Sequence, residues 1–84
     1  MQPPTLLFVC IHNHCRSILC EALSRHLSKG RIVAHSAGSQ PAGSVHPDTQ
    51  RALAERGVAT GDLRSQSWDE FATLMPDAVI PVCD

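Results

Sequence analysis

A short apolar run, Leu6–Val9 (LLFV), is the feature that most constrains how this chain folds. A continuous apolar run, rather than an alternating one, is typical of a strand that is buried on both faces of a parallel sheet. The segment CIHNHCR follows directly, and after it the apolar residues recur with helical spacing. The sequence therefore predicts a strand, a short loop and a helix in the first third of the chain.

The expected first helix has apolar positions at i, i+3, i+4, i+7 and i+8, which is the pattern of an amphipathic helix. Gly30 follows as a natural stop. We expect His26, on the apolar face, to be a buried and hydrogen-bonded side chain. The predicted core face comprises Leu19, Ala22, Leu23, His26 and Leu27.

A second strand is expected at residues 32–34, closed by the turn-rich segment SAGSQPAGS. Pro47 occupies the position of a first helical residue, where a missing N–H is harmless, so a second helix follows it. His46 is then a turn or cap residue, and Gly57 ends that helix.

Ser67 and Glu70 match the capping box S-x-x-E, which predicts a short third helix. We expect Trp68, the one tryptophan of the chain, to anchor this helix in the core. The apolar segment DAVIPVCD at residues 77–84 predicts a third strand.

The order strand, helix, strand, helix, helix, strand is that of an open parallel α/β sheet with helices on both faces. Right-handed crossovers put the first strand in the middle, which predicts the strand order 2-1-3. Helices that leave this strand in opposite directions make a switch point at its carboxyl end, where such folds bind ligands. The 84 residues are thus one domain with its site in the loop after Val9.

Composition narrows the function classes. The formal net charge is -1, so the chain lacks the basic field that binds nucleic acid or acidic membranes. Its apolar runs are far shorter than the roughly 20 residues needed to cross a bilayer, and its N-terminus lacks the basic region of a signal peptide. We expect a cytoplasmic protein without nucleic-acid or membrane partners, whose four cysteines stay reduced.

The loop has the spacing C-x-x-x-x-x-R. Backbone amides wrapped into a nest at a helix N-terminus make a site for a tetrahedral oxyanion, and Asn13 tolerates the left-handed conformation that this requires. Arg16 can clamp two anion oxygens. Cys10 then becomes a thiolate nucleophile under the anion, with Ser17 as a hydrogen-bond donor. The expected oxyanion-binding residues are Ile11, His12, Asn13, His14, Cys15 and Arg16.

A zinc site is the alternative chemistry for this loop, with Cys10, His12, His14 and Cys15 as ligands. Structural zinc sites mostly use two distant pairs of ligands, whereas the rest of the chain offers only unpaired residues such as Cys83. We therefore expect no metal. A purely structural role, with small buried cysteines, leaves the two histidines of the loop without a purpose.

Four segments in order, LLFVCIHNHCRSILCEAL, AHSAGSQPAGSVHP, LRSQSWDEF and DAVIPVCD, resemble arsenate reductases built on the low-molecular-weight protein tyrosine phosphatase fold. The resemblance covers nearly the whole chain and implies a role in arsenic resistance. It implies that Cys10 attacks arsenate, Arg16 clamps the oxyanion and Ser17 supports the thiolate. Cys83 matches the resolving cysteine, which attacks Cys10, releases arsenite and leaves a disulfide. Thioredoxin or a low-molecular-weight thiol then restores the pair, and no bound cofactor is implied.

Family members continue past the position of Asp84 with a fourth strand, a further cysteine and a general-acid loop. The resemblance therefore implies a partial domain at residues 1–84, with three strands and the fourth missing. Two alternatives to the reductase remain: a low-molecular-weight protein tyrosine phosphatase, which needs no resolving thiol, and a truncated module that binds an oxyanion without turnover. An exposed edge at the third strand, where Pro81 is tolerated, further predicts a homodimer.

Overall fold

The computed structural model describes residues 3–82. Its strands form a parallel sheet in the order β2-β1-β3, which confirms the predicted topology. In chain order the elements are β1 (Thr5–Cys10), α1 (Arg16–Ser28), β2 (Val33–Gly38), α2 (Pro47–Glu55), the 3-10 helix η1 (Trp68–Phe71) and β3 (Ala78–Pro81).

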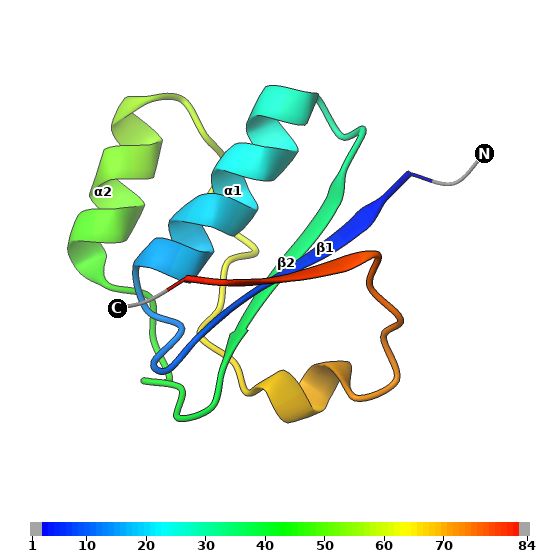
Figure 1. Ribbon diagram of the computed structural model, residues 1–84. Coiled ribbons are helices and arrows are strands. Elements are labelled where there is room, and N and C mark those ends of the chain that lie inside the picture. The colour runs from blue at the N-terminus through cyan, green and yellow to red at the C-terminus, as the bar shows by residue number, and fades with distance from the viewer. Residues whose placement is uncertain (1–2, 83–84) are drawn as a thin grey trace.

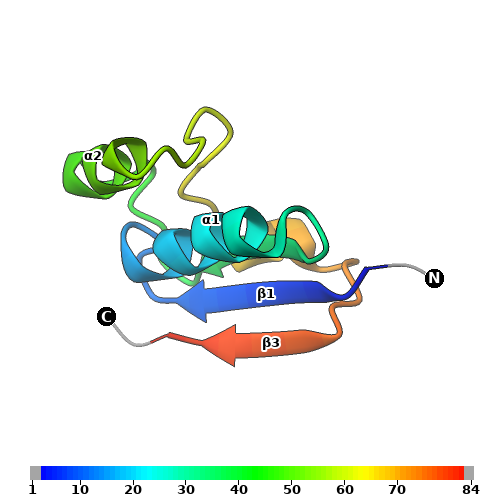
Figure 2. The same cartoon turned by 90° about the horizontal axis from the view of Figure 1, so that it is seen from above.

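The central strand β1 pairs with both neighbours, so Phe8 lies opposite Ser36 of β2 and Ile80 of β3. Figure 1 shows α1 and α2 on one side of the strands and η1 on the other, as expected for helices on both faces. Figure 2 shows β3 next to β1 at the edge of the sheet. Within residues 3–82, no helix combines the length and apolarity that a membrane span requires.

The ends of the helices follow the local sequence closely. His46 caps α2, since its Nδ1 accepts the N–H of Asp48 at 3.0 Å, and Pro47 is the first helical residue. At the C-terminal end of α1, Lys29 adopts a left-handed conformation with φ 55° and Gly30 follows at φ 81°. Proline at the start and glycine just past the end are the positions that these residues favour in helices.

Three elements differ from the prediction. The third strand was expected in the segment at residues 77–84, but β3 covers only Ala78–Pro81, and residues 83–84 lie outside the described part of the chain. The second strand was expected at residues 32–34, but β2 runs over Val33–Gly38, because each of its residues pairs with β1. Backbone pairing to a central strand outweighs the turn preference of its serine and glycine. The third helix is a single 3-10 turn, Trp68–Phe71, whose cap Ser67 accepts the N–H of Asp69 at 3.2 Å.

The predicted core face of α1 was partly wrong. Leu27 is 76% exposed and His26 is exposed as well, whereas Ile18 is fully buried. The other buried residues of α1 are Ser17, Glu21 and Ala22. The buried face of α1 therefore differs from the predicted face and lies nearer the N-terminus of the helix. Half of its residues are polar, and a search for apolar residues does not find them.

Glu21 is buried because hydrogen bonds and an ion pair replace its water. Its carboxylate accepts the hydroxyl of Ser36 at 2.5 Å and pairs with Arg25 at 2.6 Å. Burial raises the pKa of Glu21, while the Ser36 hydrogen bond and the Arg25 charge partly counteract this. Arg25 also donates to the carbonyl oxygen of Ala34, so the network joins α1 to β2.

Trp68 was expected in the core, but it is 48% exposed. The residue of η1 that packs on the sheet is instead Phe71, whose ring lies 5.1 Å from the imidazole of His35 in β2. The indole of Trp68 instead lines a pocket that Cys10 also lines.

The main apolar cluster lies between α1, α2 and the segment that follows α2. Its largest fully buried members are Ile18 and Leu53. The complete cluster comprises Ile18, Ala22, Val45, Leu53, Val58 and Leu63.

This packing yields a prediction for a matched pair of variants in α1. Ile18→Ala should lower the free energy of unfolding by about 2–5 kcal/mol, because it leaves a cavity in the cluster. Leu27→Ala should change it by less than about 0.5 kcal/mol, as an exposed substitution does. Urea unfolding followed by circular dichroism measures both values, and equal losses would contradict the observed face of α1.

Candidate oxyanion-binding site

The candidate site lies where the central strand ends. Cys10 is the last residue of β1 and Arg16 the first of α1, so residues 11–15 form the connecting loop. Parallel neighbours flank β1 on both sides, which makes this carboxyl end the switch point of the sheet. The loop therefore lies at the position predicted from the sequence, and oxyanion binding there stays a prediction.

Backbone hydrogen bonds hold the loop against the segment that follows β2. The loop carbonyl oxygens point toward residues 39–46 and accept their amides. The pairs are Cys10 O with Ser39 N (3.2 Å), Ile11 O with Gln40 N (2.8 Å), His12 O with Ala42 N (2.9 Å) and His14 O with His46 N (3.1 Å). Because these carbonyl oxygens accept hydrogen bonds from residues 39–46, they are directed away from the sulfur of Cys10.

Asn13 determines the shape of the loop. It has φ 45°, the left-handed conformation predicted for it, and its side chain is fully buried. Its Oδ1 accepts the backbone N–H of Gln66 at 2.7 Å, and its Nδ2 donates to Ser17 Oγ at 2.8 Å. Both ends of the amide are thus satisfied, as a buried polar group requires.

Two donors converge on the sulfur of Cys10. The backbone N–H of Asn13 donates to Sγ at 2.9 Å, and Ser17 Oγ lies 3.1 Å from it. Because Ser17 Oγ already accepts from Asn13 Nδ2, its hydroxyl hydrogen is available to the sulfur. This arrangement complements a negatively charged sulfur.

Gly38, the last residue of β2, lets the loop approach the sheet. A Cβ at this position would lie 2.5 Å from the carbonyl oxygen of Ile11 and 2.9 Å from the backbone nitrogen of Asn13. Both neighbours are backbone atoms, so a side chain at this position would force the loop itself to shift. Gly38 is not among the residues predicted from the sequence, although a glycine at the carboxyl end of a strand next to the loop could have marked it.

Gln66 is a second residue that the sequence did not reveal. Its N–H donates to Asn13, its carbonyl oxygen accepts the N–H of Gly38 at 2.9 Å, and its Nε2 donates to the carbonyl oxygen of Ser36 at 3.1 Å. It therefore ties the segment before η1 both to the loop and to β2. Backbone contacts of this kind leave no residue-type signal.

The remaining predicted loop residues are more open. Ile11, His12 and Arg16 are exposed, whereas His14 and Cys15 are partly buried. The ring of His14 meets that of His46 edge to face at 4.9 Å, and its Nδ1 lies 3.4 Å from the carbonyl oxygen of Ser44.

Cys83 lies outside the described residues. The residue before it, Val82, donates its N–H to the carbonyl oxygen of Val9 at 2.8 Å, next to the end of β1 that carries Cys10. In the described part of the chain, no group of three or more His, Cys, Asp or Glu side chains is placed to hold a metal ion. The zinc alternative therefore finds no support there.

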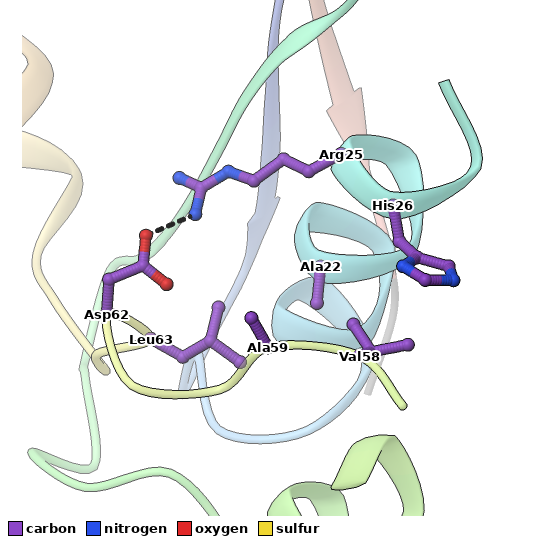
Figure 3. A pocket seen from close by; sticks show the side chains of 7 residues that line it. All are labelled: Ala22, Arg25, His26, Val58, Ala59, Asp62 and Leu63. Atoms are coloured by element: carbon purple, nitrogen blue, oxygen red, sulfur yellow. Dashed lines mark hydrogen bonds and ion pairs between the residues drawn. The ribbon is translucent and has the colours of Figure 1, made fainter. Parts of the chain in front are cut away.

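Figure 3 shows a different pocket of about 220 Å³, between α1 and the segment after α2, which Cys10 does not line. Its main polar feature is the ion pair of Arg25 with Asp62 at 2.8 Å. Arg25 also binds Glu21 and the carbonyl oxygen of Ala34, so its charge is already used within the fold. This pocket offers no reactive group comparable to Cys10.

The chain belongs to the low molecular weight phosphotyrosine protein phosphatase family, whose model matches residues 5–84. It is 31% identical over 78 residues to the glutaredoxin arsenate reductase of Synechocystis sp., covering 93% of this chain and 59% of that protein. It is 28% identical over 83 residues to arsenate reductase 1 of Staphylococcus epidermidis, covering 99% and 62%. The chain thus spans about three fifths of the length of these relatives.

Solved structures agree with this assignment. The thioredoxin-dependent arsenate reductase of Corynebacterium glutamicum superposes with a TM-score of 0.87 at 34% identity, over 99% of this chain and 44% of that one. An arsenate reductase in the phosphate binding state gives 0.85 at 30% identity, over 95% and 60%. The resemblance read from the four sequence segments is confirmed.

The contact at Gly38 leads to a second prediction. Gly38→Ala should push the loop away from β2 and weaken the Asn13 hydrogen bond to Cys10 Sγ, so alkylation of Cys10 by iodoacetamide should slow about tenfold. Peptide mass spectrometry separates Cys10 from the other cysteines. Gly61→Ala is the matched control, since nothing lies within 4 Å of the added methyl group. Equal rates in the two variants would refute the close contact.

Proposed function

We propose that this chain carries the arsenate-reducing site of a thiol-dependent arsenate reductase. The observation that carries the proposal is the pair of donors, Asn13 N–H and Ser17 Oγ, at the sulfur of Cys10 in the loop between β1 and α1. Hydrogen bonds of this kind favour a thiolate, the nucleophilic form of cysteine. The similarity to three arsenate reductases among curated proteins supports the choice of substrate.

In the proposed first step, arsenate binds over Cys10, held by amides of residues 11–16 and by the guanidinium group of Arg16. The fork of Arg16 suits two oxygens of a tetrahedral anion. The Cys10 thiolate attacks arsenic, an arsenic–oxygen bond breaks, and the departing oxygen leaves as water after protonation. The product is a covalent adduct between Cys10 Sγ and pentavalent arsenic.

In the second step, the thiolate of Cys83 attacks Cys10 Sγ. The sulfur–arsenic bond breaks, its electron pair passes to arsenic, and arsenite leaves as the two cysteines form a disulfide. An external dithiol of the thioredoxin type, or a low-molecular-weight thiol, then reduces this disulfide. The described position of Val82, beside the end of β1, is consistent with this role for Cys83. The chemistry requires no bound cofactor, and a cytoplasmic location, where such reductants work, stays a prediction.

Arsenite release in the presence of thioredoxin and its reductase tests the proposal. Cys10→Ser should abolish release because the nucleophile is lost, and Cys83→Ser should stop it after the adduct forms. Cys20→Ser, in the middle of α1, is the matched control and should keep the parent rate.

The alternatives give different results in the same assay. If Cys83→Ser releases arsenite as fast as the parent, the resolving role is wrong. Hydrolysis of p-nitrophenyl phosphate without arsenite release would identify a phosphatase, and oxyanion binding without any turnover would identify a binding module.

We also propose that the chain self-associates through β3. No strand among the described residues pairs with its outer edge, and its side chains Val79 and Ile80 are 54% and 36% exposed. An exposed apolar edge of this kind favours pairing with a second copy. Light scattering should report a dimer that Val79→Lys converts to a monomer, because a charge on the edge opposes pairing. A monomeric parent at micromolar concentration would contradict the proposal.

A further inference from the structure

An apolar pocket borders the nucleophile on the side of β3. It has a volume of about 370 Å³ and is lined by Cys10, Ile11, Trp68, Pro81 and Val82, together with Val9 and one polar residue, Ser39. Cys10 therefore belongs both to the polar loop and to this apolar wall. A ligand that reacts at its sulfur can reach into the pocket without leaving the loop.

Inorganic arsenate has no apolar group that could pack against this pocket. It is small and charged, and the amides of the loop and Arg16 match its oxygens. Apolar surface gains free energy only by covering apolar surface. The pocket therefore fits a substrate in which an apolar group is attached directly to the tetrahedral oxyanion.

The position of Trp68 in this wall is determined by its neighbours. Ser67 forms an isolated parallel bridge with Gly38 at the end of β2, and its hydroxyl caps η1. Trp68 follows at once, so its indole is held beside the loop although it is 48% exposed. Ile11, directly after the nucleophile, is likewise 50% exposed. Two large exposed apolar side chains that line one pocket together with Cys10 indicate a binding wall rather than a core.

We propose that this site accepts arylarsonates, in which a phenyl ring replaces one oxygen of arsenate. The proposal rests on the proposed reductase function and extends its substrate class. The arsonate group lies in the loop over Cys10, and the ring packs between Ile11 and Trp68. A cavity of about 150 Å³ already holds benzene, so a phenyl ring fits this pocket. Aromatic side chains such as Trp68 bind another ring by stacking or edge contacts.

The reaction follows the same steps as the reduction of arsenate. The Cys10 thiolate attacks arsenic and one oxygen leaves as water, while the carbon–arsenic bond stays intact. Cys83 attacks Cys10 Sγ, the sulfur–arsenic bond breaks with its electrons passing to arsenic, and phenylarsonous acid leaves. Two thiols are oxidised to one disulfide, arsenic falls from the pentavalent to the trivalent state, and thioredoxin restores the thiols.

The decisive experiment compares kcat/KM for phenylarsonate and arsenate, with thioredoxin as reductant. The parent should reduce both. Trp68→Ala should lower kcat/KM for phenylarsonate about tenfold more than for arsenate, as expected for the loss of one well-packed apolar contact. Trp68→Phe should restore most of the preference. Met75→Ala is the control, because Met75 is 89% exposed and does not line the pocket.

The outcomes separate the two proposals. If arsenate is reduced but phenylarsonate is not, or if Trp68→Ala affects both substrates equally, the arylarsonate proposal is wrong and the reductase stands. If neither compound is reduced, the reductase function is wrong. A measurement of phenylarsonate binding then tests separately whether the pocket holds the ring. Trp68 is the one tryptophan of the chain, so its fluorescence reports binding directly. Quenching by phenylarsonate at concentrations where methylarsonate has no effect supports the pocket, and equal quenching overturns it.

Discussion

The rest of the site depends on the hydrogen bonds that the buried side chain of Asn13 makes. It is fully buried, and it joins three parts of the chain: the loop itself, Ser17 in α1 and the backbone of Gln66 before η1. A buried amide left without partners costs about 1–3 kcal/mol, so these bonds strongly favour one loop conformation. In that conformation the N–H of residue 13 points at the sulfur of Cys10. The same side chain thus stabilises the fold and fixes a hydrogen-bond donor at the sulfur of Cys10.

The polar inner face of α1 extends this arrangement into the core. Ser17 contacts the sulfur of Cys10, and one turn later Glu21 binds Ser36 of β2 and Arg25. Such groups are stable in an interior only when they are hydrogen-bonded. A small domain gives up apolar area to hold them, and the cluster around Ile18 and Leu53 provides much of what remains. Positioning of the loop and stability of the core therefore compete for the same helix face.

The site as a whole has two unlike halves that meet at Cys10. The loop before α1 supplies amides and Arg16, which suit a charged tetrahedral group. On the other side, Ile11 and Trp68 form an apolar wall next to the end of β3. Because η1 is tied to β2 through Gly38 and Ser67, the halves hold a common position. The proposed arylarsonate, which combines an oxyanion with an apolar group, would contact both halves.

The amino-acid sequence by itself determined the topology and the position of the loop that forms the candidate site. The continuous apolar run before CIHNHCR is typical of a buried parallel strand. Because a helix follows, the loop between them must lie at the carboxyl end of that strand. Pro47 and His46 marked the start of α2 for local reasons that need no tertiary contact. The left-handed conformation of Asn13 was likewise predictable, because few residue types tolerate it.

Only the tertiary structure decided which side chains support the loop and which face of α1 is buried. Gly38 and Gln66 meet residues far away in the sequence. A glycine at the end of a strand can hint at a close approach, but only the fold identifies the atoms that come close. Polar residues at buried positions of α1 hid its inner face from the apolar pattern, which misplaced His26 and Leu27. Trp68 was misjudged for a related reason: hydrophobicity predicts burial, but the register of η1 on β2 turned Phe71 toward the sheet and left the indole beside Cys10.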